Sequence, residues 1–225
     1  MNSLGGEFHQ QRTARIASGN APTNLIDSTV LITHIIPRES IQRRANENFE
    51  RMSAEPDRFL PMGSKILQES RITADGLLVG SNANGLSENQ RAYTFVFRSG
   101  AVETVVSSIT RGHEHDFVVL PMLQTLITDQ TLRITKALNS LGYSFPYFAH
   151  VSLAGVGGLR LLQQWPEGAF PEDVPFGMLG HGLLYFDSAT LNHVPVGRHA
   201  CFESLRCTLS HLANAVGLSV PPPLN

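Results

Sequence analysis

The densest group of titratable side chains in this sequence is the run from Arg111 to Asp116, which reads Arg-Gly-His-Glu-His-Asp. In a strand, alternate side chains point to the same face, so His113 and His115 would lie side by side. Two imidazoles at this spacing, with a carboxylate nearby, form a donor set that zinc can use. His113, His115 and Asp116 are therefore the candidate metal ligands, and the chemistry they would support is metal-dependent hydrolysis, as in a hydrolase or nuclease.

The residues that follow this run favour a simpler interpretation. The run resembles the opening of the metallo-β-lactamase motif, which reads His-x-His-x-Asp-His. Here Asp116 comes one position early, and Phe117 and Val118 occupy the acidic and histidine positions. We therefore predict a polar strand end or hairpin tip, and we keep the metal-dependent hydrolase or nuclease as the alternative.

No other motif in the sequence supplies a complete catalytic group. Gly155-Val156-Gly157-Gly158 is not a dinucleotide-binding loop, because Arg160 occupies the third glycine position. Cys201 and His199 are close in sequence, but we expect them on a helix that faces the core. The remaining histidines are scattered singly, and a single histidine is more often structural than a ligand. We therefore assign no catalytic residue and no cofactor.

Basic residues gather in the segment from Arg38 to Arg51, where acidic residues interleave with them. Arginines and glutamates three or four positions apart pair along a solvated helix face. Nucleic-acid contact through Arg43, Arg44 and Arg51 is the alternative interpretation.

The composition describes a globular chain with an uneven charge distribution. The 225 residues carry a formal net charge of −2, which argues against a strongly basic surface for nucleic acid. Residues 1–75 hold as many charged side chains as residues 76–225, so the longer segment is charge-poor. Charge-poor surface is typical of an interface, which predicts a protein partner or self-association. No signal peptide or membrane span is recognisable, so a cytoplasmic location is expected and no membrane partner is expected.

Hydrophobic periodicity predicts the elements that position these residues. We expect a connector helix within residues 1–20, followed by a single domain over residues 21–225. Its clearest signals are a buried strand from Val30 to Ile36 and a hairpin around Ser99-Gly100, with Phe95 opposite Thr104. A central helix is expected over about 121–141, with Pro121 in its first turn, and an amphipathic helix over about 199–216. Residues 55–70 and 165–178 are expected to be irregular. The predicted fold class is α+β, with a mostly antiparallel or mixed sheet built from hairpins.

Several of these segments occur in an order that resembles a known family. They are Phe8–Ile16, Val30–Pro37, Asp75–Leu78, Phe97–Glu103, Val151–Val156 and Leu212–Gly217. The chain resembles the C-terminal companion region of bacterial Schlafen-like, AlbA-type DNA-binding and transcriptional-regulator proteins. The resemblance implies that nucleic acid is contacted by a separate module. It also implies a role in transcription regulation or antiviral (anti-phage) defence.

The function that we expect is accordingly non-enzymatic. The chain is predicted to be a sensor, regulatory or protein-interaction domain of a bacterial protein, working beside a nucleic-acid-binding module.

Overall fold

The computed structural model describes residues 5–41, 49–82, 85–86, 88–111, 116–164, 174–214 and 217–218. Helices and strands follow one another along the chain without the regular β-α-β alternation of an α/β fold. Their order is α1 (Gly6–Ala17), β1 (Val30–Pro37), α2 (Arg38–Ile41), α3 (Phe49–Ala54), η1 (Pro56–Phe59), β2 (Glu69–Ile72), β3 (Gly76–Gly80), β4 (Ala92–Phe97), β5 (Val102–Ser107), β6 (Phe117–Val119), α4 (Leu120–Ser140), β7 (Tyr147–Ala154), β8 (Arg160–Leu162), β9 (Phe176–Met178), β10 (Leu183–Tyr185), β11 (Ala189–Leu191), α5 (Gly197–Ser204) and α6 (Arg206–Asn214).

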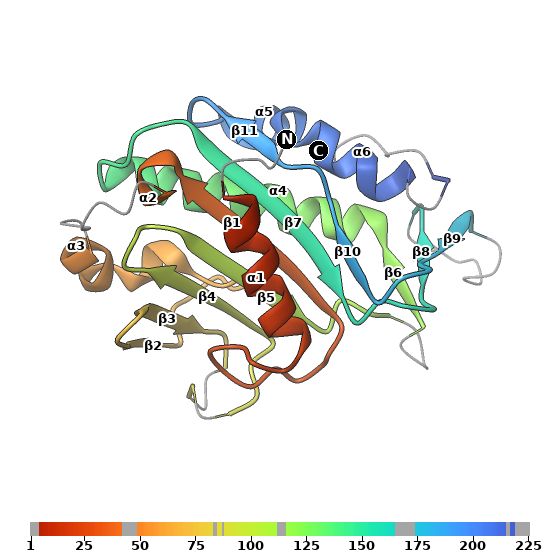
Figure 1. The fold of residues 1–225 in the computed structure, drawn as a ribbon, viewed down its shortest axis with the longest axis horizontal. Helices are drawn as coiled ribbons and strands as arrows, with labels where there is room; N and C mark the ends of the chain where they lie inside the picture. Colours follow the sequence, from red (N-terminus) through yellow and green to blue (C-terminus); the bar gives the residue numbers. More distant parts are fainter. Residues whose placement is uncertain are drawn as a thin grey trace.

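The strands form one large antiparallel sheet and one small mixed sheet (Figure 1). The eight-stranded sheet has the order β10-β7-β1-β5-β4-β3-β2, and β11 also pairs with β7. Strands β6, β8 and β9 form the second sheet, in which β6 and β8 are parallel. The predicted α+β class with an antiparallel or mixed sheet is therefore confirmed.

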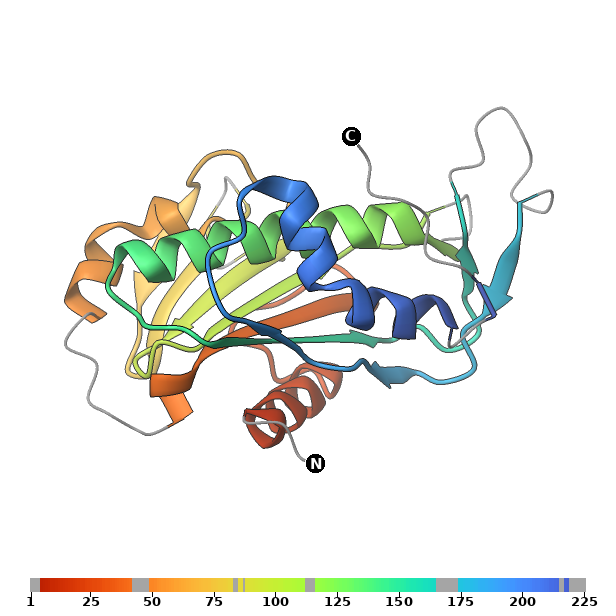
Figure 2. The same cartoon turned by 90° about the horizontal axis from the view of Figure 1, so that it is seen from above.

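Helix α4 covers one face of the large sheet and supplies much of the core. Leu123, Ile127 and Ile134 recur at helical spacing and are fully buried against the sheet. Pro121 lies in the first turn, where its missing N–H leaves no hydrogen bond unmade. Figure 2 shows α4, α5 and α6 on one side of the sheet and α1 on the opposite side.

The C-terminal helix differs from the single helix expected over 199–216. It is divided into α5 and α6 at Leu205, whose N–H is shared between the carbonyls of Cys201 and Phe202. The Ser204 hydroxyl also donates to the Ala200 carbonyl, a contact that bends helices. The break gives the two short helices different directions across α4 (Figure 2).

The register of the β4–β5 hairpin also differs from the expected one. Phe95 pairs with Glu103, not with Thr104, because the loop has three residues and not two. Gly100 adopts φ +91° in this loop, and the Phe97 N–H donates to the Ala101 carbonyl. The shift by one residue places Glu103 on the face that α1 covers, where it lies beside Tyr93.

Other expectations for irregular segments were incomplete. Strand β2 begins at Glu69, at the end of the segment 55–70, and β9 lies within 165–178; both segments lack the apolar alternation of a strand. Each is an edge strand, with one neighbouring strand among the described residues. None of the helices in the described part of the chain combines the length and the hydrophobicity that a membrane span requires.

Candidate functional site

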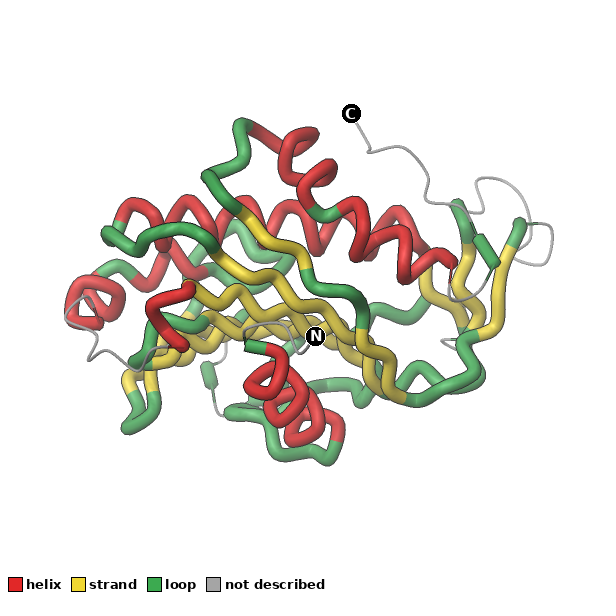
Figure 3. Tube along the Cα trace, turned by 45° about the horizontal axis from the view of Figure 1, so that its top comes forward, coloured by secondary structure: helices red, strands yellow, loops and turns green. Residues whose placement is uncertain are grey.

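Helix α1 lies across the face of the sheet that points away from α4 (Figure 3). His9, Thr13 and Ile16 are its buried residues, spaced so that they share one side of the helix. Arg12 lies one position before Thr13 and points into the same interface, where its guanidinium reaches Glu103 on β5. The helix therefore contacts the sheet through several polar side chains.

The sheet presents a row of polar residues beneath this helix. His34 on β1 pairs directly with Glu103 on β5 on one side and with His150 on β7 on the other. His34 and Glu103 are fully buried, and His150 is 3% exposed. His34 and His150 lie in the middle of β1 and β7, and Glu103 is the second residue of β5.

A continuous chain of hydrogen bonds connects the helix to this row. His9 Nε2 lies 2.6 Å from Ser152 Oγ, and His9 Nδ1 lies 2.7 Å from His34 Nδ1. His34 Nε2 lies 3.0 Å from Glu103 Oε2. The chain Ser152–His9–His34–Glu103 therefore joins β7, α1, β1 and β5.

When the His9 and His34 rings are both neutral, the ionised carboxylate of Glu103 fixes which atom donates and which accepts in each hydrogen bond of this chain. His34 then donates from Nε2 and accepts at Nδ1. His9 must consequently donate from Nδ1 and accept the Ser152 hydroxyl proton at Nε2.

Glu103 is the centre of the network. Arg12 donates to both of its oxygens, at 2.8 and 2.9 Å, and the Tyr93 hydroxyl donates at 2.9 Å. Burial alone would raise the pKa of Glu103, but the hydrogen bonds from His34 and Arg12 outweigh burial and lower the pKa to about 2. The carboxylate is therefore held in its charged form within the protein.

The same interface disfavours a positive charge on His9. Burial lowers the pKa of His9, and the neighbouring His34 and His150 lower it further. The His9 and His150 rings stack at 5.1 Å, and the His34 ring meets His9 edge-on at 4.8 Å. Burial also raises the pKa of Tyr93, as does the charge of Glu103. Docking of α1 thus requires a neutral His9.

The chain begins with a serine–histidine pair, as in serine hydrolases, but His34 separates His9 from the acid Glu103. A serine hydroxyl whose proton is accepted by a histidine, itself oriented by an acid, is a nucleophile arrangement. Ser152 is fully buried in this structure. In the docked state the network therefore holds α1 on the sheet, and Ser152 does not face solvent.

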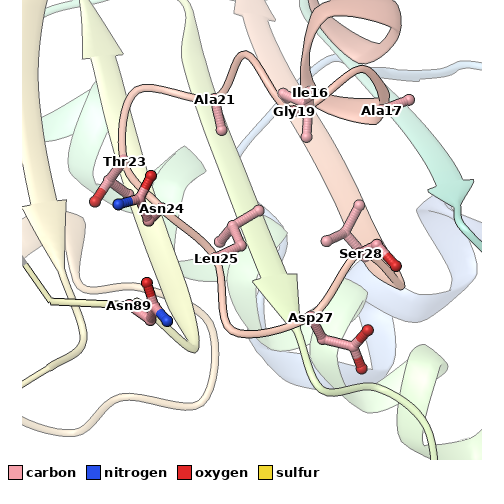
Figure 4. A pocket seen from close by; sticks show the side chains of 11 residues that line it. Ile16, Ala17, Gly19, Ala21, Thr23, Asn24, Leu25, Asp27, Ser28 and Asn89 are labelled. Carbon is pink, nitrogen blue, oxygen red and sulfur yellow. The ribbon is translucent and has the colours of Figure 1, made fainter.

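Two surface cavities adjoin α1. One, of about 400 Å³, lies at the C-terminal end of the helix (Figure 4). Its polar lining includes Asn24 and Asp27 from the α1–β1 connection and Asn89 from the loop before β4. The other, of about 230 Å³, is lined by Arg12, Arg15, Asn20, Asp75 and Phe97, among others.

The residues predicted from sequence are not brought together by the described part of the structure. His113, His115, Arg43 and Arg44 lie outside the described residues. Asp116 forms an ion pair with Arg160. Arg51 is exposed on α3. The described residues contain no group of three or more side chains suited to a metal ion.

Cys201 is buried, as expected for a helix that faces the core. Burial raises the pKa of its thiol to about 12, and the Sγ atom lies 3.4 Å from the Thr128 carbonyl oxygen. A thiol held in this way is a poor nucleophile.

The sequence reasoning missed the histidine network, because His9, His34 and His150 were each interpreted singly. The available signal was the position of His34 and His150 within two largely apolar runs and of Glu103 near the start of a third. A titratable residue that must be buried needs a partner, so three such runs predict a shared polar cluster. Comparison with family models, with curated proteins and with solved structures finds no match for this chain.

Proposed function

We propose that this chain is a non-enzymatic regulatory and protein-interaction domain, in which the docking and release of helix α1 is the regulated event. The observation that carries this proposal is the continuous chain of hydrogen bonds Ser152–His9–His34–Glu103, which joins α1 to three strands. A second link from Arg12 to Glu103 reinforces the same contact.

A polar interface suits a helix that leaves and returns. Buried charged groups hold a partner only while every bond is made, so the loss of one partner weakens the whole contact. A helix of 12 residues is also marginal in water by itself. Release of α1 would therefore free the helix for another partner and expose the polar row on the sheet.

The smaller cavity provides a route by which a ligand controls this release. Arg12 lines this cavity and also holds Glu103. An anion bound there competes with Glu103 for the guanidinium and thereby weakens α1 docking. Binding of the anion is thus the signal that the domain senses. Arg15 is the second cationic group that lines the cavity.

The wider context of the proposal rests on the family resemblance in the sequence. We place the domain beside a separate nucleic-acid-binding module, in bacterial transcription regulation or anti-phage defence. The unpaired cysteines Cys201 and Cys207 support a reducing, cytoplasmic environment. Retention of this chain alone on immobilised DNA that falls steeply with salt and is lost in Arg51→Glu would contradict the separate module.

Hydrogen exchange measured by mass spectrometry tests the release of α1. In Arg12→Met, we expect amide exchange in residues 6–17 to rise at least about tenfold, because the network loses its strongest donor. Strands β1, β5 and β7 should keep their protection. Arg15→Met is the matched control, since Arg15 is on the same helix but exposed. If α1 exchanges only when the sheet does, it is not an independent element and the proposal fails.

A serine-reactive fluorophosphonate probe tests the non-enzymatic part. We expect no labelling of Ser152, because its hydroxyl is buried beneath α1. Labelling of Ser152 that disappears in His9→Ala would instead indicate a serine hydrolase.

A further inference from the structure

We propose that a second copy of this chain pairs with the free edge of β2, so that one antiparallel sheet continues across a two-fold axis at Ser70. The proposal rests on the interaction role inferred above and names its partner. It is independent of the α1 network, which lies at the centre of the sheet and not at this edge.

Strand β2 is the last strand of the large sheet and lies at its margin (Figure 1). Its one neighbour among the described strands is β3, with Arg71 opposite Leu78 and Glu69 opposite Gly80. An edge strand leaves the N–H and C=O groups of alternate residues without a ladder partner, which is a template for pairing with another chain.

The hydrogen-bond pattern identifies the residues that face outward. The Thr73 N–H donates to the Gly76 carbonyl, so this pair is hydrogen-bonded. In an antiparallel ladder such pairs alternate, which makes Arg71–Leu78 and Glu69–Gly80 the next two. The main-chain groups of Ser70 and Ile72 therefore point away from β3, toward the free edge.

The neighbouring ladder gives the same result independently. The Arg98 N–H donates to the Asp75 carbonyl, so residues 77 and 79 of β3 bond to β4. Residues 78 and 80 are then left to bond to β2. This agrees with the outward orientation of Ser70.

The charges on β2 select one register for a symmetric pair. A two-fold axis at Glu69 or at Arg71 would place like charges opposite each other, which is destabilising. An axis at Ser70 places Glu69 opposite Arg71 of the second copy, twice. These are non-hydrogen-bonded positions, where opposed side chains are closest.

The exposed apolar residues next to β2 fit the same arrangement. Ile66, Leu67 and Ile72 are 64%, 37% and 57% exposed. With the axis at Ser70, Ile72 of each copy lies opposite Gln68, adjacent to Ile66 and Leu67 of the other copy. Pairing would bury apolar surface that is otherwise in water.

Sedimentation velocity over the micromolar range tests the pairing. We expect the wild-type chain to shift with concentration from its 24.6 kDa monomer to a dimer. Ser70→Pro should remain monomeric, because proline removes an outward N–H that β3 does not use. Ser70→Ala retains this N–H and should dimerise like the wild type. Circular dichroism checks that each variant is folded.

A charge-reversal pair makes the test independent of folding defects. Arg71→Glu and Glu69→Arg should each weaken dimerisation about tenfold, because each places like charges opposite one another. An equimolar mixture of the two variants restores both opposite-charge pairs and should form the heterodimer. Glu69 also accepts a hydrogen bond from the Leu86 N–H, so the mixture is the decisive measurement.

The outcomes separate this inference from the proposed function. A wild-type chain that is monomeric at every concentration overturns the pairing, as does a dimer that is insensitive to Ser70→Pro and to both charge reversals. Neither result affects the α1 exchange experiment, whose failure would in turn leave a β2-dependent dimer standing.

Discussion

His34 stands directly opposite Glu103 across the β1–β5 ladder, and its Nε2 lies 3.0 Å from a carboxylate oxygen of Glu103. Both side chains are fully buried. A buried carboxylate is tolerated only when its charge is compensated by hydrogen bonds and an opposite charge. The Arg12 guanidinium of α1 supplies the remaining compensation, which ties the helix to the charge state of the sheet.

Glu103→Gln should destabilise the protein by about 3 kcal/mol, because it leaves the Arg12 guanidinium in the interface without its counter-charge. Urea denaturation followed by circular dichroism measures the loss. Glu7→Gln is the control on the exposed side of α1 and should change the free energy of unfolding by less than about 0.5 kcal/mol. Equal stability of the two variants would show that the network does not hold the helix.

Tyr93→Phe should cost about 1.5 kcal/mol, because the lost hydroxyl donates to a charged acceptor that keeps its other partners. Tyr147→Phe is a matched substitution at another fully buried tyrosine, whose hydroxyl donates to the neutral carbonyl of Tyr143. It should cost less, about 1 kcal/mol. The reverse order in thermal or urea denaturation would argue against a charged Glu103.

Stability should fall as the pH is lowered, through two overlapping contributions. The pKa of His9 is below its ordinary value of 6.5, so the unfolded chain binds the proton first. Stability from His9 is therefore present above about pH 6.5 and is lost below it, by at most about 1.4 kcal/mol per pH unit. Glu103, with a pKa lowered from 4.5 to about 2, adds a second loss between those values.

His9→Gln separates the two contributions. The groups that face His9 are His34, His150, Ser152 and Tyr185. Removing the His9 imidazole should reduce the slope of unfolding free energy against pH below 6.5 and leave the Glu103 contribution in place. An unchanged slope in this variant would assign the pH dependence to other groups.

Purified protein should contain no stoichiometric zinc or manganese, because Asp116 is engaged by Arg160. Elemental analysis by mass spectrometry measures the metal content, and His115→Ala should leave both the metal content and the stability unchanged. One equivalent of metal that is lost in His115→Ala would support the hydrolase or nuclease alternative.

Patterns of neighbouring residues in the sequence predicted the elements that depend mainly on residues close to one another in the chain. The β-branched run of β1 and the start of α4, with Pro121 in its first turn, follow from residue types within a few positions of each other. The hairpin between β4 and β5 was predicted from the same kind of signal. Its register was wrong by one residue, because Gly100 closes a three-residue loop and not a two-residue one.

By itself, the sequence determined the α+β class and the central helix, and it predicted a helix within residues 1–20, but as a connector and not as an element packed on the sheet. Only the tertiary structure decided that His9, His34, His150 and Glu103 belong to one network. His9 is 25 residues from His34 and 143 from Ser152, and His34 is 69 from Glu103. Such contacts depend on strand order and register, which are set by pairing between distant segments and by burial of whole faces, and no local pattern encodes them.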